Sequence, residues 1–576
     1  MAGGGGPIAG SVLVVVEVAP PQAASTAIDA SEAGKASTQR NAATLSGAGN
    51  TLGHVARAQV SRDNRLPRGL LTVCVVVAAV VATPVVITIV QAFQGGSAAV
   101  ARVFTSHNSL SLLLRTLAVA ALATPLCGVL GLGSAWLVER TRLPGRRVWS
   151  LLVVAPLVVP LFVTSYAYAG LSSSLQGFWG AVAIIAFSHY AIVFLLVAAS
   201  LRVMDPALEE TARSLGLTAW KTFRRVVLPQ LRPALYGGLL LVALDALVEF
   251  GAFAAFHYQT FTISIYAQYQ LSFTASGATA LSGIPIVLCT LILFTEARLR
   301  GGINYTRVSA GSRRALSRHR LGRATPLALG GMTLLAAVSL GISLGMLVYW
   351  FTQSSSAASS GAAADLRYLG PATLTSVLLG VASALLAIVM ALPIAILAVR
   401  HFGPVVTVLE RSVYLAFALP ELVAAVALTY GISHLAPALY ESVVLLVLAE
   451  AMLFLPFAVV ALRSTLGLIE PAFEESARSL GLGPLRTLWR VTLPLARPGL
   501  AAAGVLVFAF TLADLSTAQV LLPPGMDTLG TEFSADARAV SFAAAAPYAA
   551  VLVGLAMLAT YLLGTRFGRV RGFGDH

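Results

Sequence analysis

Apolar stretches of about 20 residues, the length that a helix needs to cross a bilayer core, recur along this chain between short polar stretches. Backbone polar groups in lipid must be satisfied within the segment, so each stretch is predicted to be an α-helix. Twelve of them follow Gly69, at residues 69–93, 116–138, 148–171, 179–201, 234–256, 278–297, 327–350, 375–399, 412–432, 441–462, 500–522 and 541–564. The pattern predicts an all-α polytopic membrane protein with twelve transmembrane helices.

The composition supports this prediction. The 576 residues are 57% hydrophobic and 11% charged, whereas soluble domains carry about 25% charged residues. Residues 1–68 differ, because they are rich in Gly, Ala, Ser and Thr, and they predict a disordered cytoplasmic segment. The three cysteines lie in apolar stretches and have neither metal-site spacing nor a disulfide pattern.

The basic residues are distributed unevenly between the two sides of the predicted membrane. With the N-terminus placed inside, 34 of the 38 Lys and Arg residues fall on the inner side, and the outer side holds Arg102, Arg115, Arg367 and Arg538. The positive-inside rule therefore predicts that both termini are cytoplasmic. We attribute the net charge of +14 to this orientation and to contact with anionic lipid, not to nucleic-acid binding.

One polar segment occurs twice. Residues 204–235 and 469–500 align without a gap at an offset of 265, and 18 of the 32 positions are identical. Each copy follows the fourth helix of a six-helix unit, and an even number of helices gives both units the same orientation, as in a parallel repeat. We therefore predict two six-helix halves, at residues 69–298 and 327–564. A basic cytoplasmic linker at residues 299–326 joins them, and a cytoplasmic tail follows at residues 565–576.

Each copy is predicted to form two short helices around a glycine. In the first copy, Pro206 favours a helix start, Glu209 and Glu210 lie near the positive end of that helix, and Gly216 permits the left-handed residue that closes it. A second, basic helix is expected to run to Leu228-Pro229, where the chain turns toward the membrane. The second copy repeats these features with Pro471, Glu474, Glu475, Gly481 and Leu493-Pro494.

These residues resemble the signature loop of binding-protein-dependent ABC importer permeases, which reads E-A-A, three residues, G, nine residues and I-x-L-P. The first copy has Glu210-Thr211-Ala212, Gly216 and Val226-Val227-Leu228-Pro229, and the second has Glu475-Ser476-Ala477, Gly481 and Val491-Thr492-Leu493-Pro494. The replacements are small and keep the spacing. The resemblance implies the type I ABC importer permease fold and an ATPase-coupling role for Glu209, Glu210, Ala212, Gly216, Pro229, Glu474, Glu475, Ala477, Gly481 and Pro494.

The resemblance also implies the partners, which are two copies of an ABC ATPase subunit and an extracytoplasmic solute-binding protein, beside the lipid bilayer. Lysine occurs only at Lys35 and Lys221, and neither completes a phosphate-binding loop. We therefore expect no ATPase site, no catalytic residue and no cofactor on this chain, with ATP-Mg bound by the partner ATPase.

Short sequence segments indicate which solute such an importer would carry. Both halves are fused in one chain, which is similar to the ferric-iron, thiamine and 2-aminoethylphosphonate branches of these importers. The segment at residues 249–252, with 260–262 and 265–266 after it, looks like the ferric-iron branch, as do residues 515–517 and 527–529. The resemblance favours ferric iron, with 2-aminoethylphosphonate or another oxyanion, thiamine and polyamine as alternatives.

Ionisable residues inside the apolar stretches are functional candidates, because a charge in hydrocarbon is costly. Glu249 and Asp514 are related by the same offset of 265, and at about 1.5 Å per residue each lies roughly 22 Å from the cytoplasmic end of its helix. We hypothesise that they flank the translocation path and favour a cation. The alternative is that they form hydrogen bonds to a neighbouring helix or stay protonated.

Three further residues complete this set of path candidates. Asp245 shares a helix face with Glu249, because the two are four residues apart. His189 and Glu450 occupy similar places before the two loops, and we expect interhelical contacts there and not a ligand pair. Glu421, beside Pro420, is expected near a helix break. No group has the ligand count of a resident metal site.

Two other protein classes fit less well. A major-facilitator-type secondary transporter also has twelve helices in two parallel halves, but residues 139–147 lack its Asp-Arg-x-Gly-Arg core, and that class does not explain two matched loops. A membrane-embedded enzyme would need a nucleophile–base pair or a metal motif, and the sequence offers neither.

Overall fold

The computed structural model describes residues 67–94, 107–204, 206–272, 283–284, 287–288, 291, 318–357, 361–401, 403–414, 419–467 and 469–567. Within these ranges the secondary structure is helical, and the sole β pairing is an isolated bridge between Thr141 and His319. The predictions for residues 1–66, for most of the linker and for the end of the C-terminal tail lie outside the described residues.

The first half is built from long helices and one bent pair. Its elements are α2 (Arg68–Gln94), α4 (His107–Arg140), α5 (Arg146–Val154), α6 (Leu161–Leu171), α7 (Phe178–Val203), α8 (Pro206–Ser214), α9 (Ala219–Thr222), α10 (Leu228–Val248), α11 (Gly251–Ala255) and α12 (Phe261–Ser272).

The second half has a similar order of helices. Its elements are α14 (Thr325–Ala336), α15 (Ile342–Ala357), α16 (Gly361–Arg400), α17 (Pro404–Val413), α18 (Glu421–Leu435), α19 (Val443–Leu453), α20 (Leu455–Leu466), α21 (Pro471–Ser479), α22 (Pro484–Thr487), α23 (Leu493–Ala513), α24 (Ser516–Leu521), α25 (Leu529–Arg538) and α26 (Phe542–Phe567). Its bent pair, however, is α19 with α20.

Eight of the described helices are long and apolar enough to cross a membrane, and two bent pairs raise the number to ten if each pair is one span. The bends are 91° between α5 and α6 and 52° between α19 and α20. Prolines explain both bends, because Pro160 precedes α6 and Pro456 lies at the start of α20.

The expected number of twelve spans is not reached in the described residues. The predicted ninth span is represented by α17 and the 15-residue α18, which starts directly after Pro420, as expected for a break at Glu421. The predicted sixth span, 278–297, lies almost wholly outside the described residues.

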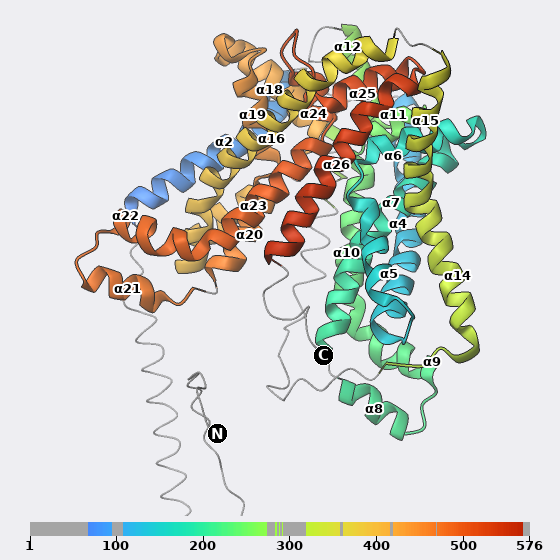
Figure 1. Cartoon of the computed structure of the whole chain (residues 1–576). Coiled ribbons are helices and arrows are strands. Elements are labelled where there is room, and N and C mark those ends of the chain that lie inside the picture. Colours follow the sequence, from blue (N-terminus) through green and yellow to red (C-terminus); the bar gives the residue numbers. More distant parts are fainter. Residues whose placement is uncertain are drawn as a thin grey trace, which may run out of the picture. The chain divides into compact units, whose positions relative to one another are not determined.

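The first helix of each half packs against the other half. α2 contacts α16, α17, α18 and α19 of the second half. α15 contacts α6 of the first half as well as α26 of its own half, and α14 lies beside α5. Figure 1 shows α2 among the second-half helices and α14 and α15 along the outer side of the first-half helices. The two halves therefore exchange their first helices.

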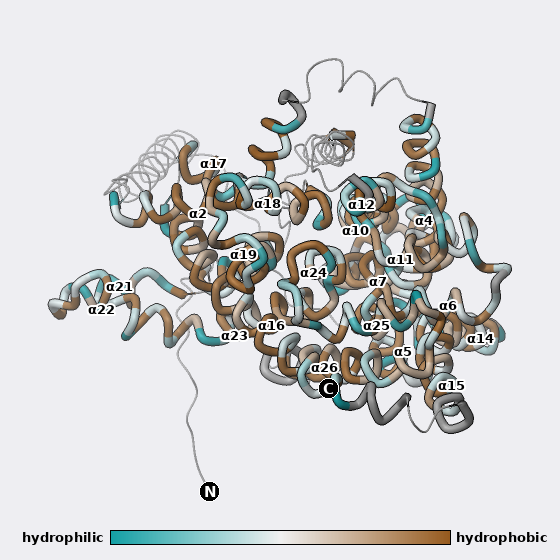
Figure 2. The backbone as a smooth tube through the Cα atoms, turned by 90° about the horizontal axis from the view of Figure 1, so that it is seen from above, coloured by the Kyte–Doolittle hydropathy of each residue, from teal (hydrophilic) through white to brown (hydrophobic). Residues whose placement is uncertain are grey.

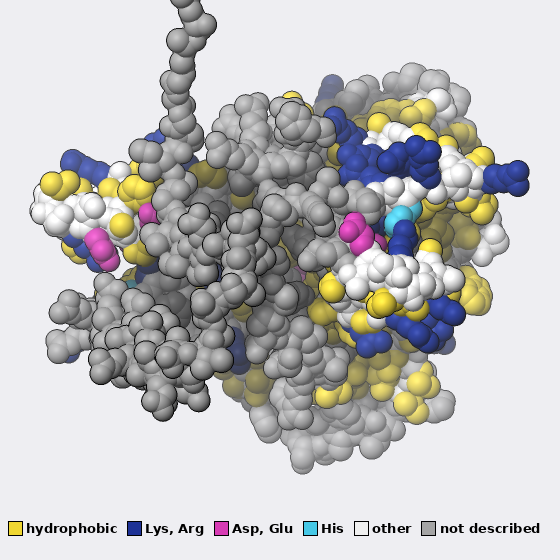
Figure 3. Space-filling view, turned by 90° about the horizontal axis from the view of Figure 1, so that it is seen from below, with side chains coloured by type: hydrophobic (Ala, Val, Ile, Leu, Met, Phe, Trp, Pro, Cys, Tyr) yellow, Lys and Arg dark blue, Asp and Glu magenta, His cyan; other side chains and the backbone are white. Residues whose placement is uncertain are grey.

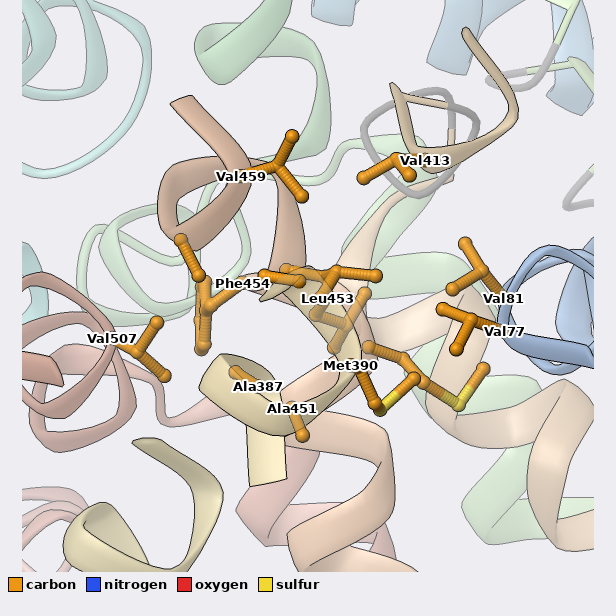
Figure 4. Packing of buried hydrophobic residues seen from close by; sticks show 14 of the residues in the cluster. Val77, Val81, Ala387, Met390, Val413, Ala451, Leu453, Phe454, Val459 and Val507 are labelled. Atoms are coloured by element: carbon orange, nitrogen blue, oxygen red, sulfur yellow. The ribbon is translucent and has the colours of Figure 1, made fainter. Parts of the chain in front are cut away.

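The apolar core follows this exchange. One cluster joins Val77 and Val81 of α2 to Met390 of α16 and to Leu453 and Val507 of the second half (Figure 4). The tube in Figure 2 is hydrophobic along most of the long helices. Cys74 and Cys127 are free and fully buried among these apolar side chains, as expected for small core residues.

Candidate functional site

The duplicated segment forms the same structure in both halves. We call α8 with α9 the first loop and α21 with α22 the second loop. Every boundary in the second loop is offset by 265 residues from its counterpart in the first. The sequence prediction of a short helix closed by a glycine is confirmed, but the second predicted short helix is the start of a long one.

The glycine closes the first short helix in both loops. Gly216 has φ +83° and Gly481 has φ +85°. The Gly216 N–H donates to the carbonyl of Arg213 at 2.9 Å, and the Leu217 N–H donates to the carbonyl of Ala212 at 3.1 Å. The second loop has the same two bonds with the same lengths. This is the Schellman ending, in which glycine takes the left-handed conformation without a steric penalty.

A buried ion pair attaches each loop to its half. Arg140, the last residue of α4, lies 3.0 Å from Glu209, and Arg400, the last residue of α16, lies 3.1 Å from Glu474. The Arg140 and Glu209 side chains are 1% and 7% exposed. Glu474 also accepts a hydrogen bond from Thr492 at 3.0 Å. The first glutamate of each loop, Glu209 or Glu474, therefore anchors that loop. The sequence alone did not distinguish this role from that of the next glutamate.

The second glutamate of each loop faces outward. Glu210 and Glu475 are exposed, while Ala212 and Ala477 are buried against the half. Large apolar side chains are exposed beside the glutamates, namely Leu208, Leu215, Trp220, Phe473, Leu480, Leu485 and Trp489. In Figure 3, Lys and Arg side chains flank hydrophobic ones at the right, on the side where Figure 1 has α8 and α9. Each loop thus offers a mixed apolar and charged surface, as protein interfaces do.

The expected turn at Leu228-Pro229 is wrong. The helix runs without a break from Ala219 to Val248, and the same is true from Pro484 to Ala513. A π-helical turn at 223–227, repeated at 488–492, precedes each proline. Its wider hydrogen bonds link Leu228 N–H to the Phe223 carbonyl, and Pro229 then sits in the first turn of α10, where its missing N–H is tolerated.

Each long helix ends at one of the candidate acids. α10 stops at Val248, and the Glu249 carboxylate accepts a hydrogen bond from the Ala252 N–H at 2.8 Å. α23 stops at Ala513, and Asp514 accepts from the N–H groups of Ser516 and Thr517 at 2.8 and 3.2 Å. Both acids thus cap the short helix that follows, as carboxylates do at helix N-termini, and neither continues the long helix as the sequence had predicted.

The other candidates converge on the same region. His189 of α7 lies 2.7 Å from Asp245 of α10, so the interhelical partner of this histidine is Asp245. Glu450 is fully buried, and its carboxyl group lies within electrostatic range of Asp514, as does that of Glu421. Glu421 lies at the start of α18. The structure therefore brings all five path candidates together and adds Glu421. The sequence had marked Glu421 only as the site of a helix break, because it follows Pro420.

This acidic cluster joins both halves but is not a metal cage. Glu249 from the first half interacts electrostatically with Asp514 and Glu421 of the second. Asp514 also lines a small cavity with Ser376, Thr511 and Thr528. In the part of the chain that the structure describes, no group of three or more His, Cys, Asp or Glu side chains is arranged to hold a metal ion.

Comparison with known proteins gives a consistent result for both halves. A family model described as "Binding-protein-dependent transport system inner membrane component" matches residues 49–299 and 391–570. The Fe(3+)-transport system permease protein FbpB 2 of Haemophilus influenzae is 34% identical over 442 residues, which cover 76% of this chain and 86% of that protein.

Shorter relatives match about one half. The sulfate transport system permease protein CysT of Escherichia coli is 30% identical over 253 residues, covering 40% of this chain and 89% of that protein. The molybdenum transport system permease protein ModB of Mycobacterium tuberculosis is 31% identical over 158 residues, covering 25% of this chain and 60% of that protein.

Proposed function

We propose, from the premise that the chain belongs to the family of binding-protein-dependent transport system inner membrane components, that its cargo is ferric iron. Membership of this family makes the chain the multi-pass permease of an ABC importer. Such permeases work with a solute-binding protein and with an ATPase that is, in the general arrangement of the family, a separate subunit. The observation that carries the cargo proposal is the similarity to a ferric-iron permease over both halves at once.

The two loops are proposed to be the docking sites for two ATPase subunits. Glu210 and Glu475 would contact the ATPase together with the exposed apolar residues around them, while Glu209 and Glu474 hold each loop to its half. Two equivalent loops support a ratio of two ATPase subunits to one permease. The arginine-rich ends of the helices next to the loops support a cytoplasmic location for the loops and for both termini.

The geometry also supports a mechanical path from loop to membrane. α9, the π-turn and α10 form one continuous helix that begins in the first loop and ends at Glu249. The second loop is connected to Asp514 in the same way. A movement of either loop would therefore shift the helix that leads to the acid at its far end. ATP-Mg is expected on the ATPase partners, and the chain itself is proposed to bind no cofactor.

The acidic cluster is proposed to lie on the translocation path, with Asp245, Glu249, Asp514, His189 and Glu450 as its members. Buried carboxylates attract a cation and repel an oxyanion. Sulfate and molybdate are anions, so the shorter relatives do not fit this cluster as cargo models.

The cargo is tested by uptake into proteoliposomes that hold this chain with its ATPase and ATP. Ferric iron, sulfate and molybdate are each presented on the binding protein that carries them. We expect ATP-dependent accumulation of iron alone. Accumulation of sulfate or molybdate without iron would overturn the cargo proposal and leave the family assignment untouched.

The docking role is tested in the same vesicles by reversing the exposed charges with Glu210→Lys and Glu475→Lys. We expect ATP hydrolysis to lose its coupling to uptake, because the reversed charge opposes the ATPase surface while the anchoring pairs at Glu209 and Glu474 stay intact. The matched control is Arg147→Glu with Arg411→Glu, which changes the same amount of charge at exposed positions outside both loops. Normal coupling in the double variant would refute the docking assignment.

A further inference from the structure

The end of the linker between the halves is attached to the first loop. The His319 N–H donates to the carbonyl of Arg140, and the Arg142 N–H donates to the carbonyl of His319, both at 2.9 Å. These bonds form the isolated parallel bridge between Thr141 and His319. The linker therefore adds one short strand-like contact directly beside Arg140, the residue that anchors Glu209.

The His319 side chain reaches the first loop itself. Its two ring nitrogens lie 3.4 and 3.1 Å from the guanidinium of Arg213, and its Nε2 lies 3.9 Å from Glu209. The ring also lies 6.4 Å from that of Trp136, which packs edge-on against Phe223 in the π-turn. One linker residue thus contacts α8, α4 and the side chains that lead into α10.

The second loop also has a histidine beside it, which comes from a different part of the chain. His401 directly follows Arg400, just as Thr141 follows Arg140, and His401 lies near Arg478, the counterpart of Arg213. A histidine therefore accompanies the loop arginine in both halves. The second half supplies it from the end of α16, whereas the first half has threonine there and receives the histidine from the linker.

We propose that His319 is a positioning residue for the first loop, so that the linker completes one of the two ATPase docking sites instead of only joining the halves. The inference rests on the proposed docking function of the loops. It makes the two sites inequivalent, because only the first depends on a residue of the linker.

The charges around His319 give the contact a pH dependence. Burial lowers the pKa of His319, the positive charges of Arg213 and Arg140 lower it further, and Glu209 opposes them. The neutral ring can accept a hydrogen bond from Arg213, but a protonated ring would meet two cations. The contact is therefore complete above the ordinary histidine pKa, about 6.5, and is lost as pH falls below that value.

The test is deuterium exchange of the amides in α8 and α21, measured on the full chain in nanodiscs with and without the ATPase. We expect His319→Ala to speed exchange in α8 about tenfold, the effect of losing one hydrogen bond to a charged group, and to leave α21 unchanged. His401→Ala is the matched control and should affect α21 alone. His319→Asn, which keeps an acceptor oxygen, should restore slow exchange in α8.

The pH profile separates positioning from general loosening. At about pH 7.5 the α8 exchange of His319→Ala should differ from that of the wild type, and the two should converge as the pH falls through the lowered pKa of His319, because the wild-type ring then becomes protonated. His319→Asn should show no such convergence. Equal α8 exchange in wild type and His319→Ala over this whole pH range would overturn the inference.

The same variants distinguish this inference from the docking proposal. If α8 exchange rises in His319→Ala and iron uptake per ATP hydrolysed falls, both stand. If α8 exchange rises and coupling is normal, the positioning role stands and the docking role of the first loop fails. If α8 exchange is unchanged while the charge reversal at Glu210 still uncouples, the docking role stands and the positioning role fails.

Discussion

At the scale of single residues, the two membrane acids have a structural role beside the proposed one. The sequence offered Glu249 and Asp514 as flanks of a path or as partners of a neighbouring helix. The structure gives each of them N–H groups of the following short helix as partners. A capping role alone does not need a charge, because Asn and Gln can also accept from a backbone N–H.

That difference allows the charge to be tested separately from the cap. The double variant Glu249→Gln with Asp514→Asn keeps an oxygen at each cap, so we expect normal insertion and a similar thermal unfolding temperature. Iron uptake should fall by about tenfold or more, since removal of a charge that an ion meets in a low-dielectric site costs at least about 1.4 kcal/mol. Unchanged uptake would remove both residues from the path, and loss of insertion would show that the cap needs the charge.

At the scale of elements, the sequence predicts the left-handed glycine that ends each short helix, but it does not predict the π-turn. The left-handed residues at Gly216 and Gly481 follow from the sequence because few other residues adopt positive φ without strain. The continuous helix through Pro229 does not follow, since proline normally ends or kinks a helix. It depends on the π-turn, whose hydrogen bonds span one residue more than those of an α-helix. Residue propensities do not predict where such a turn forms.

The loop ending gives an element-scale prediction. Gly216→Ala with Gly481→Ala should strain each ending by about 1–2 kcal/mol and tilt the short helices, so that uptake per ATP hydrolysed falls severalfold while the chain stays in the membrane. Gly483→Ala is the matched control in the same loop, because φ is −67° there and a Cβ atom would meet nothing within 4 Å. Equal effects of the control and the double variant would refute the argument from positive φ.

At the scale of the whole molecule, the exchange of first helices decides how the halves associate. α2 is part of the first half in sequence but packs on the second, and α14 and α15 are displaced in the opposite sense. Val77 and Val81 of α2 share a buried cluster with α16 and α23. The association therefore rests on buried apolar surface from both halves, not on the linker as a tether.

Cutting the chain inside the linker tests this. Co-expressed fragments 1–305 and 306–576 should copurify and insert together, because each carries the helix that the other half needs. The matched control ends the first fragment at residue 305 but begins the second at residue 361, which removes α14 and α15. The yield of copurified fragments should then fall severalfold, because the surface that packs on α5 and α6 is lost. Copurification that does not depend on α14 and α15 would contradict the exchange.

The sequence alone determined the helical membrane class, the duplication and the two loops, because apolar length, internal identity and the positions of glycine and proline are local properties. Only the tertiary structure decided which glutamate of each pair is buried, since Arg140 and Arg400 come from helices about 70 residues away. The gathering of Glu421 and Glu450 around Asp514, the exchange of first helices and the contact of His319 with Arg213 depend in the same way on packing between distant segments. Such packing is selected by buried surface and paired charge, and a pattern along the chain does not reveal it.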